Sequence, residues 1–566
     1  MNKEKFDLAL QYLKKKNIKG AIELFEKILE NEPNHLQSNF ILGTICAQSK
    51  NFKKAHKLLN KAIQIKPFFF EAHNNLGLLH MELQQLEKAK KCFETVVKIN
   101  PNYSDAYNNL GMTLISLSEN DDAKKNLEKS IEINKKNFQA YLNLGLLYRN
   151  SEKIELAEEL IIKSIEINPK FLPGHINLMQ LYEKLNEDEK LNESINNAEI
   201  NFKNSPIVKL YKGKFFYKKE KFPEAINNLE NINFKSSYLI LEETRCSILA
   251  KSYDQLNKNE DAFQYFKKSN EMNFKIYEGK NNKNNFLNLI SKRKKFFNNL
   301  LIKKWPTTKT GNKKKDPVFL IGFPRSGTTL LDTILRSHSS IKVMEELPIL
   351  ENIIIKLNKN TNGDFNKLRN INENLLSELR DYYYENRTKI IKEDDNNKIY
   401  IDKMPLNIIY VGEILRIFPN AKFILMLRHP CDCVLSSFMQ SFKLNDAMAN
   451  FLSLEDSANL YNNVMELWTK YLKSFSINYC SVKYENIVFN FEKTISSILE
   501  FLDLPWSDNV FDFQKTAKNR GLIHTPSYNQ VVKPIYNKSV GRWKYYEKNM
   551  SDIVPILNPW IKKFNY

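Results

Sequence analysis

A spacing of 34 residues recurs along the first 170 residues and limits what this part of the chain can fold into. Small residues keep this step in two columns: Gly43, Gly77, Gly111 and Gly145, and Ala21, Ala55, Ala89, Ala123 and Ala157. A fixed period of about 20–50 residues is typical of repeat architectures, in which each unit buries its apolar face against its neighbours. The sequence therefore predicts a stacked array of repeats.

Each repeat is predicted to be a pair of helices. An apolar stripe at helical spacing marks the first helix, as in Leu76, Leu79 and Leu83. The small Gly77 allows a second helix to approach closely, and Pro101 ends that second helix. The units resemble the tetratricopeptide repeat (TPR), which implies an α-solenoid, a TPR superhelix. We expect this array over residues 1–275, with five clear repeats in 2–169 and degenerate repeats after them.

One polar column keeps the same period: Asn75, Asn109, Asn143 and Asn177. The resemblance to TPR solenoids implies that these first helices line a concave face. A side-chain amide both donates and accepts hydrogen bonds, so the column could hold the backbone of a polypeptide partner or acceptor. The alternative is that the same amides only tie neighbouring repeats together.

The composition limits partners and compartment. Lys and Arg total 85 against 65 Asp and Glu, and the net charge of +20 indicates acidic partners or a solvated lysine-rich surface; we expect no nucleic acid. No apolar run is long enough to span a bilayer, and the first residues lack the apolar core of a secretory signal. Six scattered cysteines predict neither a disulfide scaffold nor a zinc site, so we expect a cytoplasmic protein. Residues 276–315 are basic and are interpreted as a hinge or linker.

A strand, a glycine-containing loop and a helix follow the linker. Residues 317–322, PVFLIG, are apolar enough for a buried parallel strand, FPRSGTT comes next, and LLDTILRSH is helical. This order is typical of a phosphate-binding loop, although a simple helix cap is the plainer alternative. Gly322 and Gly327 have the P-loop spacing, but Thr328 stands where a Mg-dependent nucleotide triphosphatase needs Lys.

The segment PRSGTT resembles the 5′-phosphosulfate loop of the sulfotransferases. The resemblance implies a three-layer α/β domain with a P-loop-like parallel sheet over residues 316–566. It also implies 3′-phosphoadenylyl sulfate (PAPS) as the sulfuryl donor and no metal. The residues that would hold the 5′-phosphosulfate are Arg325, Ser326, Gly327, Thr328 and Thr329.

A second strand, AKFILML at residues 421–427, again runs into a loop and a helix. The resemblance implies that Arg428, at the strand end, and Ser436, eight residues on, hold the 3′-phosphate of the donor. An Arg fork beside a hydroxyl is chemically suited to a phosphate monoester. In VKYENIV, Tyr484 takes the position that packs against adenine in this family.

Two further segments resemble the protein-tyrosine branch of the family. YIDKMPLN contains Lys403, where that branch has a lysine near the transferred sulfuryl group. Residues 525–543 resemble its donor-covering segment. There Ser527 aligns with an active-site serine, Lys533 with a motif lysine, and Arg542 with a 3′-phosphate cation.

The catalytic base is assigned by spacing within this resemblance. Glu346 lies 21 residues after Arg325, as the glutamate base does in the protein-tyrosine sulfotransferases, and Glu345 is the competing candidate. Two acids favoured by a helix N-terminus are the alternative. The chain departs from the animal enzymes at Pro348 and Gln440, where those enzymes have arginines.

The sequence thus predicts a PAPS-dependent sulfotransferase that modifies a polypeptide tyrosine recruited by the TPR array. Three alternatives remain: a sulfotransferase for a carbohydrate or small metabolite, with the repeats for assembly only; a P-loop NTPase or kinase; and a non-catalytic scaffold. Thr328 argues against the NTPase. Retention of Arg325, Arg428, Ser436 and Lys403 argues against the scaffold.

Overall fold

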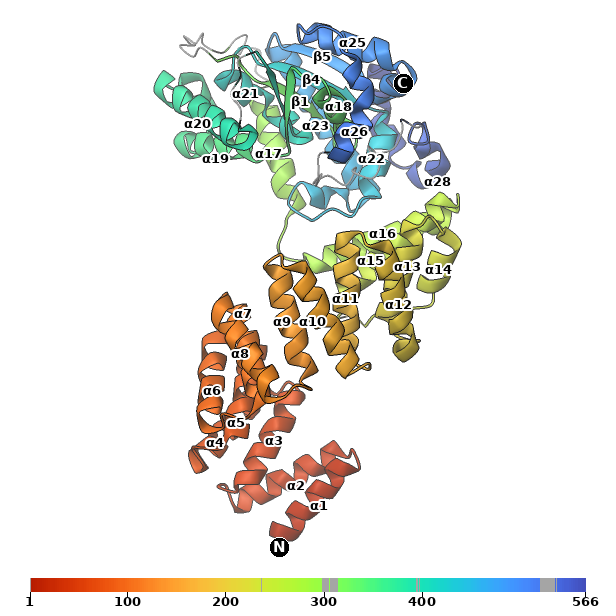
Figure 1. Ribbon diagram of the computed structural model, residues 1–566. Helices are drawn as coiled ribbons and strands as arrows, with labels where there is room; N and C mark the ends of the chain where they lie inside the picture. The colour runs from red at the N-terminus through yellow and green to blue at the C-terminus, as the bar shows by residue number, and fades with distance from the viewer. Residues whose placement is uncertain are drawn as a thin grey trace. The chain divides into compact units, whose positions relative to one another are not determined.

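The computed structural model describes residues 2–235, 237–297, 305, 314–392, 395, 397–519, 535 and 537–566. The chain divides into two compact units. Unit 1 is Met1–Lys219 and unit 2 is Glu220–Tyr566. Unit 1 is entirely helical where it is described, and unit 2 contains helices and one parallel sheet (Figure 1).

Unit 1 is a stack of antiparallel helix pairs, which confirms the predicted solenoid. Its helices are α1 (Asn2–Lys14), α2 (Ile18–Asn31), α3 (Leu36–Gln48), α4 (Phe52–Ile65), α5 (Phe70–Glu82), α6 (Leu86–Ile99), α7 (Ser104–Ser116), α8 (Asn120–Ile133), α9 (Phe138–Asn150), α10 (Ile154–Ile167), α11 (Leu172–Leu185), α12 (Asp188–Phe202) and α13 (Pro206–Lys218). The first helix of each pair begins 34 residues after the preceding one, from α1 through α13. The period therefore extends beyond residue 169 into the repeats whose sequence is degenerate.

The turn inside each pair repeats as regularly as the helices. One residue per turn has a positive φ between 56° and 65°, again at steps of 34: Lys16, Lys50, Gln84, Ser118, Glu152, Asn186 and Glu220. Small residues bring the two helices together. A Cβ at Gly77 would lie 2.7 Å from the ring of Phe93, which is fully buried on the second helix. This contact lies within one pair, and the rest of the apolar surface of the pair is covered by the neighbouring pairs.

Unit 2 begins with further helices before the sheet. They are α14 (Phe222–Leu229), α15 (Leu239–Gln255), α16 (Asn259–Ile276) and α17 (Lys283–Phe296). Helix α17 lies inside the segment interpreted as a linker, and it belongs to the core of unit 2. Its Arg293 is 1% exposed and donates from Nε to Oε1 of the equally buried Glu413 at 2.8 Å.

The sheet of unit 2 has five parallel strands in the order β2-β3-β1-β4-β5. The strands are β1 (Val318–Gly322), β2 (Ile341–Glu345), β3 (Ile399–Lys403), β4 (Lys422–Leu427) and β5 (Asn478–Lys483). The helices that follow β1 are α18 (Thr328–Arg336), α19 (Ile349–Thr361), α20 (Glu373–Ile391), α21 (Val411–Ile417), α22 (Pro430–Phe438), α23 (Leu454–Ser474), α24 (Tyr484–Phe489), α25 (Phe491–Phe501), α26 (Phe513–Asn519), α28 (Glu547–Met550) and α29 (Val554–Lys563). Short 3₁₀ turns are η1 (Phe365–Asn370), η2 (Pro405–Tyr410), η3 (Met448–Phe451), η4 (Asp508–Asp512) and η5 (Arg542–Tyr546).

Both faces of the sheet are covered, which gives the predicted three layers. Leu320 of β1 belongs to a buried cluster with Ile334 of α18 and Ile498 of α25. The next side chain back along the strand, Phe319, points the other way, and its ring centroid lies 6.4 Å from that of Tyr383 on α20. Strands buried on both faces read as continuous apolar runs, as the sequence of β1 does.

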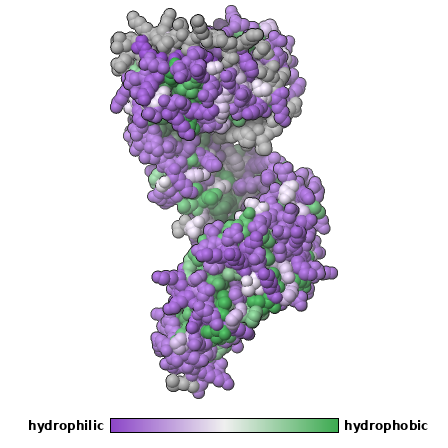
Figure 2. Space-filling view, turned by 90° about the vertical axis from the view of Figure 1, so that its left-hand side faces the viewer, coloured by the Kyte–Doolittle hydropathy of each residue, from purple (hydrophilic) through white to green (hydrophobic). Residues whose placement is uncertain are grey.

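The visible surface is mostly hydrophilic, with apolar residues appearing between polar ones (Figure 2). Exposed large apolar side chains in unit 1 include Phe68 and Ile200. None of the helices formed by the described residues combines the length and the hydropathy that a bilayer crossing requires.

Candidate active site

The predicted phosphate loop lies at the carboxyl edge of the sheet, between neighbouring strands. The chain leaves β1 toward β2 and β3 on one side, while β4 pairs with β1 on the other. Such a reversal opens a crevice at the strand ends, where parallel-sheet proteins bind ligands. Arg325 and Gly327 of the loop have positive φ values of 67° and 101°. The loop then enters α18 at Thr328, so the backbone N–H groups at the helix start are available to an anion.

Two predicted anion ligands that are distant in sequence lie together beside this loop. Arg428, the residue after β4, donates from Nη1 to the carbonyl oxygen of Arg325 at 3.0 Å. Arg325 in turn donates from Nε to Oγ of Ser436 on α22 at 3.1 Å. The Arg428 guanidinium also lies over the Tyr484 ring, 5.1 Å from its centroid. A Cβ at Gly327 would meet that same ring at 2.7 Å, so Tyr484 borders the loop.

Buried polar atoms at this place have hydrogen-bonding capacity to spare. Within the described part of the chain, Ser326 Oγ and Arg428 Nε have no hydrogen-bond partner, although Ser326 is 1% and Arg428 7% exposed. A buried donor without a partner is costly, and an anionic oxygen satisfies it. These residues therefore fit the phosphate groups of a PAPS-like donor.

The acidic candidates meet Lys403 at the ends of β2 and β3. Glu345 and Lys403 are register partners in these parallel strands. Lys403 is fully buried, and its Nζ lies 2.8 Å from Oε1 of Glu346 and 3.1 Å from Oε1 of Glu345. The Glu346 side chain is 33% exposed and the Glu345 side chain 10%. One lysine thus positions two carboxylates, of which Glu346 is the more accessible.

The C-terminal segment reaches the same region through contacts that the sequence did not indicate. Asp432 of α22 accepts from the backbone N–H of Gly541 at 2.8 Å and of Trp543 at 2.9 Å. Arg542, predicted to bind the 3′-phosphate, forms an ion pair of 2.7 Å with Asp254 of α15. Ser527 and Lys533 lie outside the described residues.

The cysteines near the loop are not poised as nucleophiles. Burial raises the pKa of the Cys431 thiol to about 12 and that of Cys433 further. A thiol of this kind carries little of the reactive thiolate at neutral pH. No group of three or more His, Cys, Asp or Glu among the described residues could hold a metal ion.

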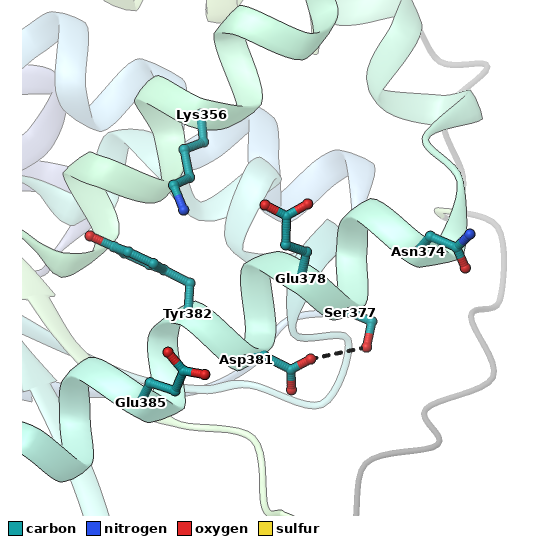
Figure 3. A pocket seen from close by; sticks show the side chains of 7 residues that line it. All are labelled: Lys356, Asn374, Ser377, Glu378, Asp381, Tyr382 and Glu385. Carbon is teal, nitrogen blue, oxygen red and sulfur yellow. Dashed lines mark hydrogen bonds between the residues drawn. The ribbon is translucent and has the colours of Figure 1, made fainter.

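A pocket of about 490 Å³ lies between α19 and α20, apart from these residues (Figure 3). Three of its lining side chains are acidic: Glu378, Asp381 and Glu385. Its one lysine, Lys356, lies over the Tyr382 ring at 3.9 Å from the centroid. None of the predicted site residues lines this pocket, and its negative charge does not suit an anionic donor.

The asparagine column of unit 1 forms hydrogen bonds between repeats. Asn143 Nδ2 donates to Oδ1 of Asn108 at 2.8 Å, and Asn109 Nδ2 donates to Oδ1 of Asn74 at 3.1 Å. Asn75 Nδ2 donates to Thr44 Oγ1 at 2.9 Å in the same manner. All four side chains of the column remain partly exposed. The column therefore ties neighbouring repeats together while its edge stays accessible.

The family comparisons agree with this geometry. Residues 317–508 match the sulfotransferase family. Unit 2 therefore contains a sulfotransferase domain. Tetratricopeptide repeat models match residues 6–68, 70–103, 92–125 and 126–159 of unit 1. The chain therefore combines TPR repeats with a sulfotransferase domain.

Relatives of the sulfotransferase region include enzymes that act on protein tyrosine. Protein-tyrosine sulfotransferase 1 of Danio rerio is 27% identical over 258 residues, covering 44% of this chain and 72% of that protein. The Drosophila melanogaster enzyme is 25% identical over 259 residues, covering 44% and 52%. An uncharacterized protein of Aquifex aeolicus is 33% identical over 261 residues, but the match spans only 34% of its length.

Solved structures resemble part of the repeat array. A tetratricopeptide repeat protein from Parabacteroides merdae is 18% identical, with a TM-score of 0.37, and covers 44% of this chain and 98% of that one. The crystal structure of MamA is 26% identical, with a TM-score of 0.27, and covers 29% and 95%.

Two acidic residues that the sequence analysis did not single out hold the C-terminal segment in place. Neither residue is predicted to contact the donor. Asp432 accepts hydrogen bonds from the backbone of Gly541 and Trp543, and Asp254 forms the ion pair with Arg542. No local motif signals them, since an acid in a short helix or in a repeat is ordinary. Their role follows only from contacts across more than 100 residues of sequence.

Proposed function

We propose that unit 2 transfers the sulfuryl group of PAPS to a hydroxyl acceptor. The observation that carries this proposal is the contact of Arg428 with Arg325 and of Arg325 with Ser436, beside the buried and unpartnered Ser326 Oγ. The cations and hydroxyls that follow β1 and β4 thus lie side by side. This arrangement suits a ligand that carries two anionic groups. Tyr484, which borders the loop, offers its ring to the adenine.

The proposed reaction is an in-line displacement at sulfur. Glu346 removes the proton of the acceptor hydroxyl while the acceptor oxygen bonds to sulfur. The bond between sulfur and the bridging oxygen of the donor breaks, and adenosine 3′,5′-bisphosphate leaves. Lys403, which contacts Glu346, orients this base, and it is proposed to stabilise charge on the sulfuryl and bridging oxygens. Ser527 is proposed to assist there, and Lys533 and Arg542 to hold the donor.

We propose that the acceptor is a tyrosine in a polypeptide in the cytoplasm. The names of the relatives support the tyrosine. The TPR repeats support a polypeptide, because solenoids offer extended surfaces for chains. Six cysteines, all within the described residues and all free, support a reducing compartment.

Label transfer tests both the donor and the acceptor. The full chain is incubated with PAPS carrying radioactive sulfur and a cell lysate, and the products are separated into protein, glycan and small molecules. We expect label in protein that survives as tyrosine sulfate after hydrolysis. Label in glycan or small molecules would contradict the proposed polypeptide acceptor but would agree with PAPS as the donor. Calorimetry that finds ATP binding as tightly as adenosine 3′,5′-bisphosphate would overturn the donor.

The asparagine column tests how a polypeptide acceptor is held. Replacing Asn75, Asn109, Asn143 and Asn177 with Ala should raise KM for a long acceptor and leave a short tyrosine peptide nearly unchanged. The inter-repeat bonds add a second expectation, a lower melting temperature of unit 1. Assays at a temperature where the variant is folded, checked by circular dichroism, separate the two effects. Equal KM changes for both acceptors would contradict recruitment along the column.

A further inference from the structure

One face of α15 covers loops next to the candidate donor site of unit 2. Side chains on this face come at steps of four, four and three residues: Glu243, Ser247, Lys251 and Asp254. Near one end, Ser441 Oγ donates to Glu243 Oε1 at 2.7 Å. Near the other end, Asp254 pairs with Arg542 at 2.7 Å. Lys251 therefore lies between two fixed contacts, on the side of the helix that faces the sulfotransferase domain.

The partner helix α16 fixes the same arrangement from a second direction. Asn270 Nδ2 donates to the carbonyl oxygen of Phe438 at 3.0 Å, and Asn273 Nδ2 donates to that of Phe442 at 3.0 Å. Phe438 is the last residue of α22, the helix that carries Ser436. Buried amides that satisfy these carbonyls hold α15 and α16 on the end of α22.

Lys251 is the basic side chain of this face, and the two acids beside it already have partners, Glu243 in Ser441 and Asp254 in Arg542. Lys251 is half-buried, and it lies within electrostatic range of Arg325, a cation of the predicted phosphate loop. Burial lowers the pKa of Lys251, Glu243 opposes that shift, and Arg325 lowers the pKa again. Glu243 offsets part of the cost of burying the Lys251 charge, and an anionic group of a bound ligand would offset it further.

A neutral residue, Gln440, lies near the end of α22 that α15 and α16 cover. Gln440 stands where the family resemblance leads us to expect a second phosphate-binding arginine. Its Nε2 donates to the carbonyl oxygen of Ser441, the residue whose hydroxyl bonds to Glu243 on α15. The helix that supplies Lys251 thus covers the end of α22 at the point where the expected positive charge is missing.

We propose that Lys251, supplied by the helical pair α15–α16, binds the phosphate monoester of the donor, its 3′-phosphate, together with Arg428 and Ser436. This inference rests on the proposed function. The last repeat-like helix pair is then part of the donor site of the sulfotransferase domain.

Nucleotide binding to the full chain tests the inference. Isothermal titration calorimetry compares adenosine 3′,5′-bisphosphate with adenosine 5′-monophosphate, which lacks the 3′-phosphate. Lys251→Met should weaken bisphosphate binding by about 10- to 100-fold, the range for a lost charged hydrogen bond, and leave monophosphate binding unchanged. Lys251→Arg should keep most of the bisphosphate affinity. Lys267→Met, at an exposed lysine of α16, is the matched control and should bind as the wild type does.

The outcomes separate this inference from the proposed function. A wild-type chain that does not bind the bisphosphate overturns the proposed donor. A wild-type chain that binds it, with Lys251→Met equally tight, overturns only the role of Lys251. Equal weakening of both nucleotides overturns the assignment to the 3′-phosphate. Without nucleotide, Lys251→Met should melt no lower than the wild type, because burial disfavours the charged lysine more than its neighbours favour it. Lost binding together with a much lower melting temperature would indicate a structural lysine and overturn the inference.

Discussion

Helix pairs serve two different purposes in this chain, and their polar contacts distinguish them. In unit 1 the bonds between pairs join residues about one repeat apart, as in Asn143 with Asn108. In α15 and α16 they join residues far apart in sequence, as in Asp254 with Tyr546, which are separated by 292 residues. A contact that repeats with the period extends a stack, whereas a contact made once fixes a particular loop. The same local architecture can therefore build a surface or complete a site.

This comparison predicts that the substitutions that lower turnover most lie in unit 2. Glu346→Gln keeps the shape of the base and removes its function, so kcat should fall by about 10²–10⁴-fold with little change in donor affinity. Glu345→Gln should lower kcat much less, since the side chain of Glu345 is less accessible. Steady-state kinetics with a short tyrosine peptide measure both, and Asn143→Ala is the control from unit 1. Equal losses in the two glutamate variants would contradict the assignment of the base.

The buried ion pair of α17 sharpens the comparison in terms of stability. Glu413→Ala leaves Arg293 charged and buried without its partner, which should lower the free energy of unfolding of unit 2 by about 3–5 kcal/mol. All five tryptophans lie in unit 2, so their fluorescence during urea unfolding reports on this unit. Lys125→Ala breaks an exposed pair within a repeat of unit 1, and it should change the stability of its own unit by less than about 1 kcal/mol, as followed by circular dichroism. Similar losses of stability in Glu413→Ala and Lys125→Ala would contradict the difference between a buried pair of unit 2 and an exposed pair of unit 1.

A buried carboxyl group makes the stability of unit 2 depend on pH. Burial raises the pKa of Asp402 to about 7, and the Tyr383 hydroxyl donates to its Oδ2 at 3.2 Å. A raised pKa favours the protonated folded form, so this stabilisation is complete below about pH 4 and is lost as pH rises to 7. Asp402→Asn should therefore gain about 2–4 kcal/mol over the wild type between pH 4 and pH 8.

Tryptophan fluorescence in urea, compared at several pH values, measures this gain. The difference between variant and wild type matters, because the other titrating groups contribute equally to both. Asp552→Asn, at an exposed position, is the control, and its difference should stay flat. A flat difference for Asp402→Asn as well would show that this carboxyl group is not the source of the dependence.

The smallest expected effect concerns one bond between repeats. Asn143→Ala removes the bond to Asn108 and should lower the free energy of unfolding of unit 1 by about 0.5–1.5 kcal/mol. Asn126→Ala, whose bond stays within its own helix, is the matched control and should cost less. Circular dichroism at 222 nm follows the helices of unit 1. A cost in the control as large as in Asn143→Ala would show that the column does not connect the repeats.

The sequence by itself determined the parts whose contacts are local or periodic. A 34-residue period specifies helix pairs, because Gly77 and its equivalents in three other repeats each face a large apolar side chain of the second helix. An apolar run followed by PRSGTT likewise predicts a strand and an anion-binding loop, since both features lie within about ten residues. The three layers and the sulfotransferase resemblance follow from such segments. The assigned roles of Ser527 and Lys533 stay predictions.

Only the tertiary structure decided how distant segments meet. It brought Lys403 between Glu345 and Glu346 through the register of two parallel strands. It paired Arg542 with Asp254, and it brought Asn270 of α16 to the carbonyl oxygen of Phe438. The resemblance named Lys403, Glu346 and Arg542 as site residues, but no local pattern indicates which carboxylate each cation contacts. These contacts depend on packing between elements that are distant in the sequence.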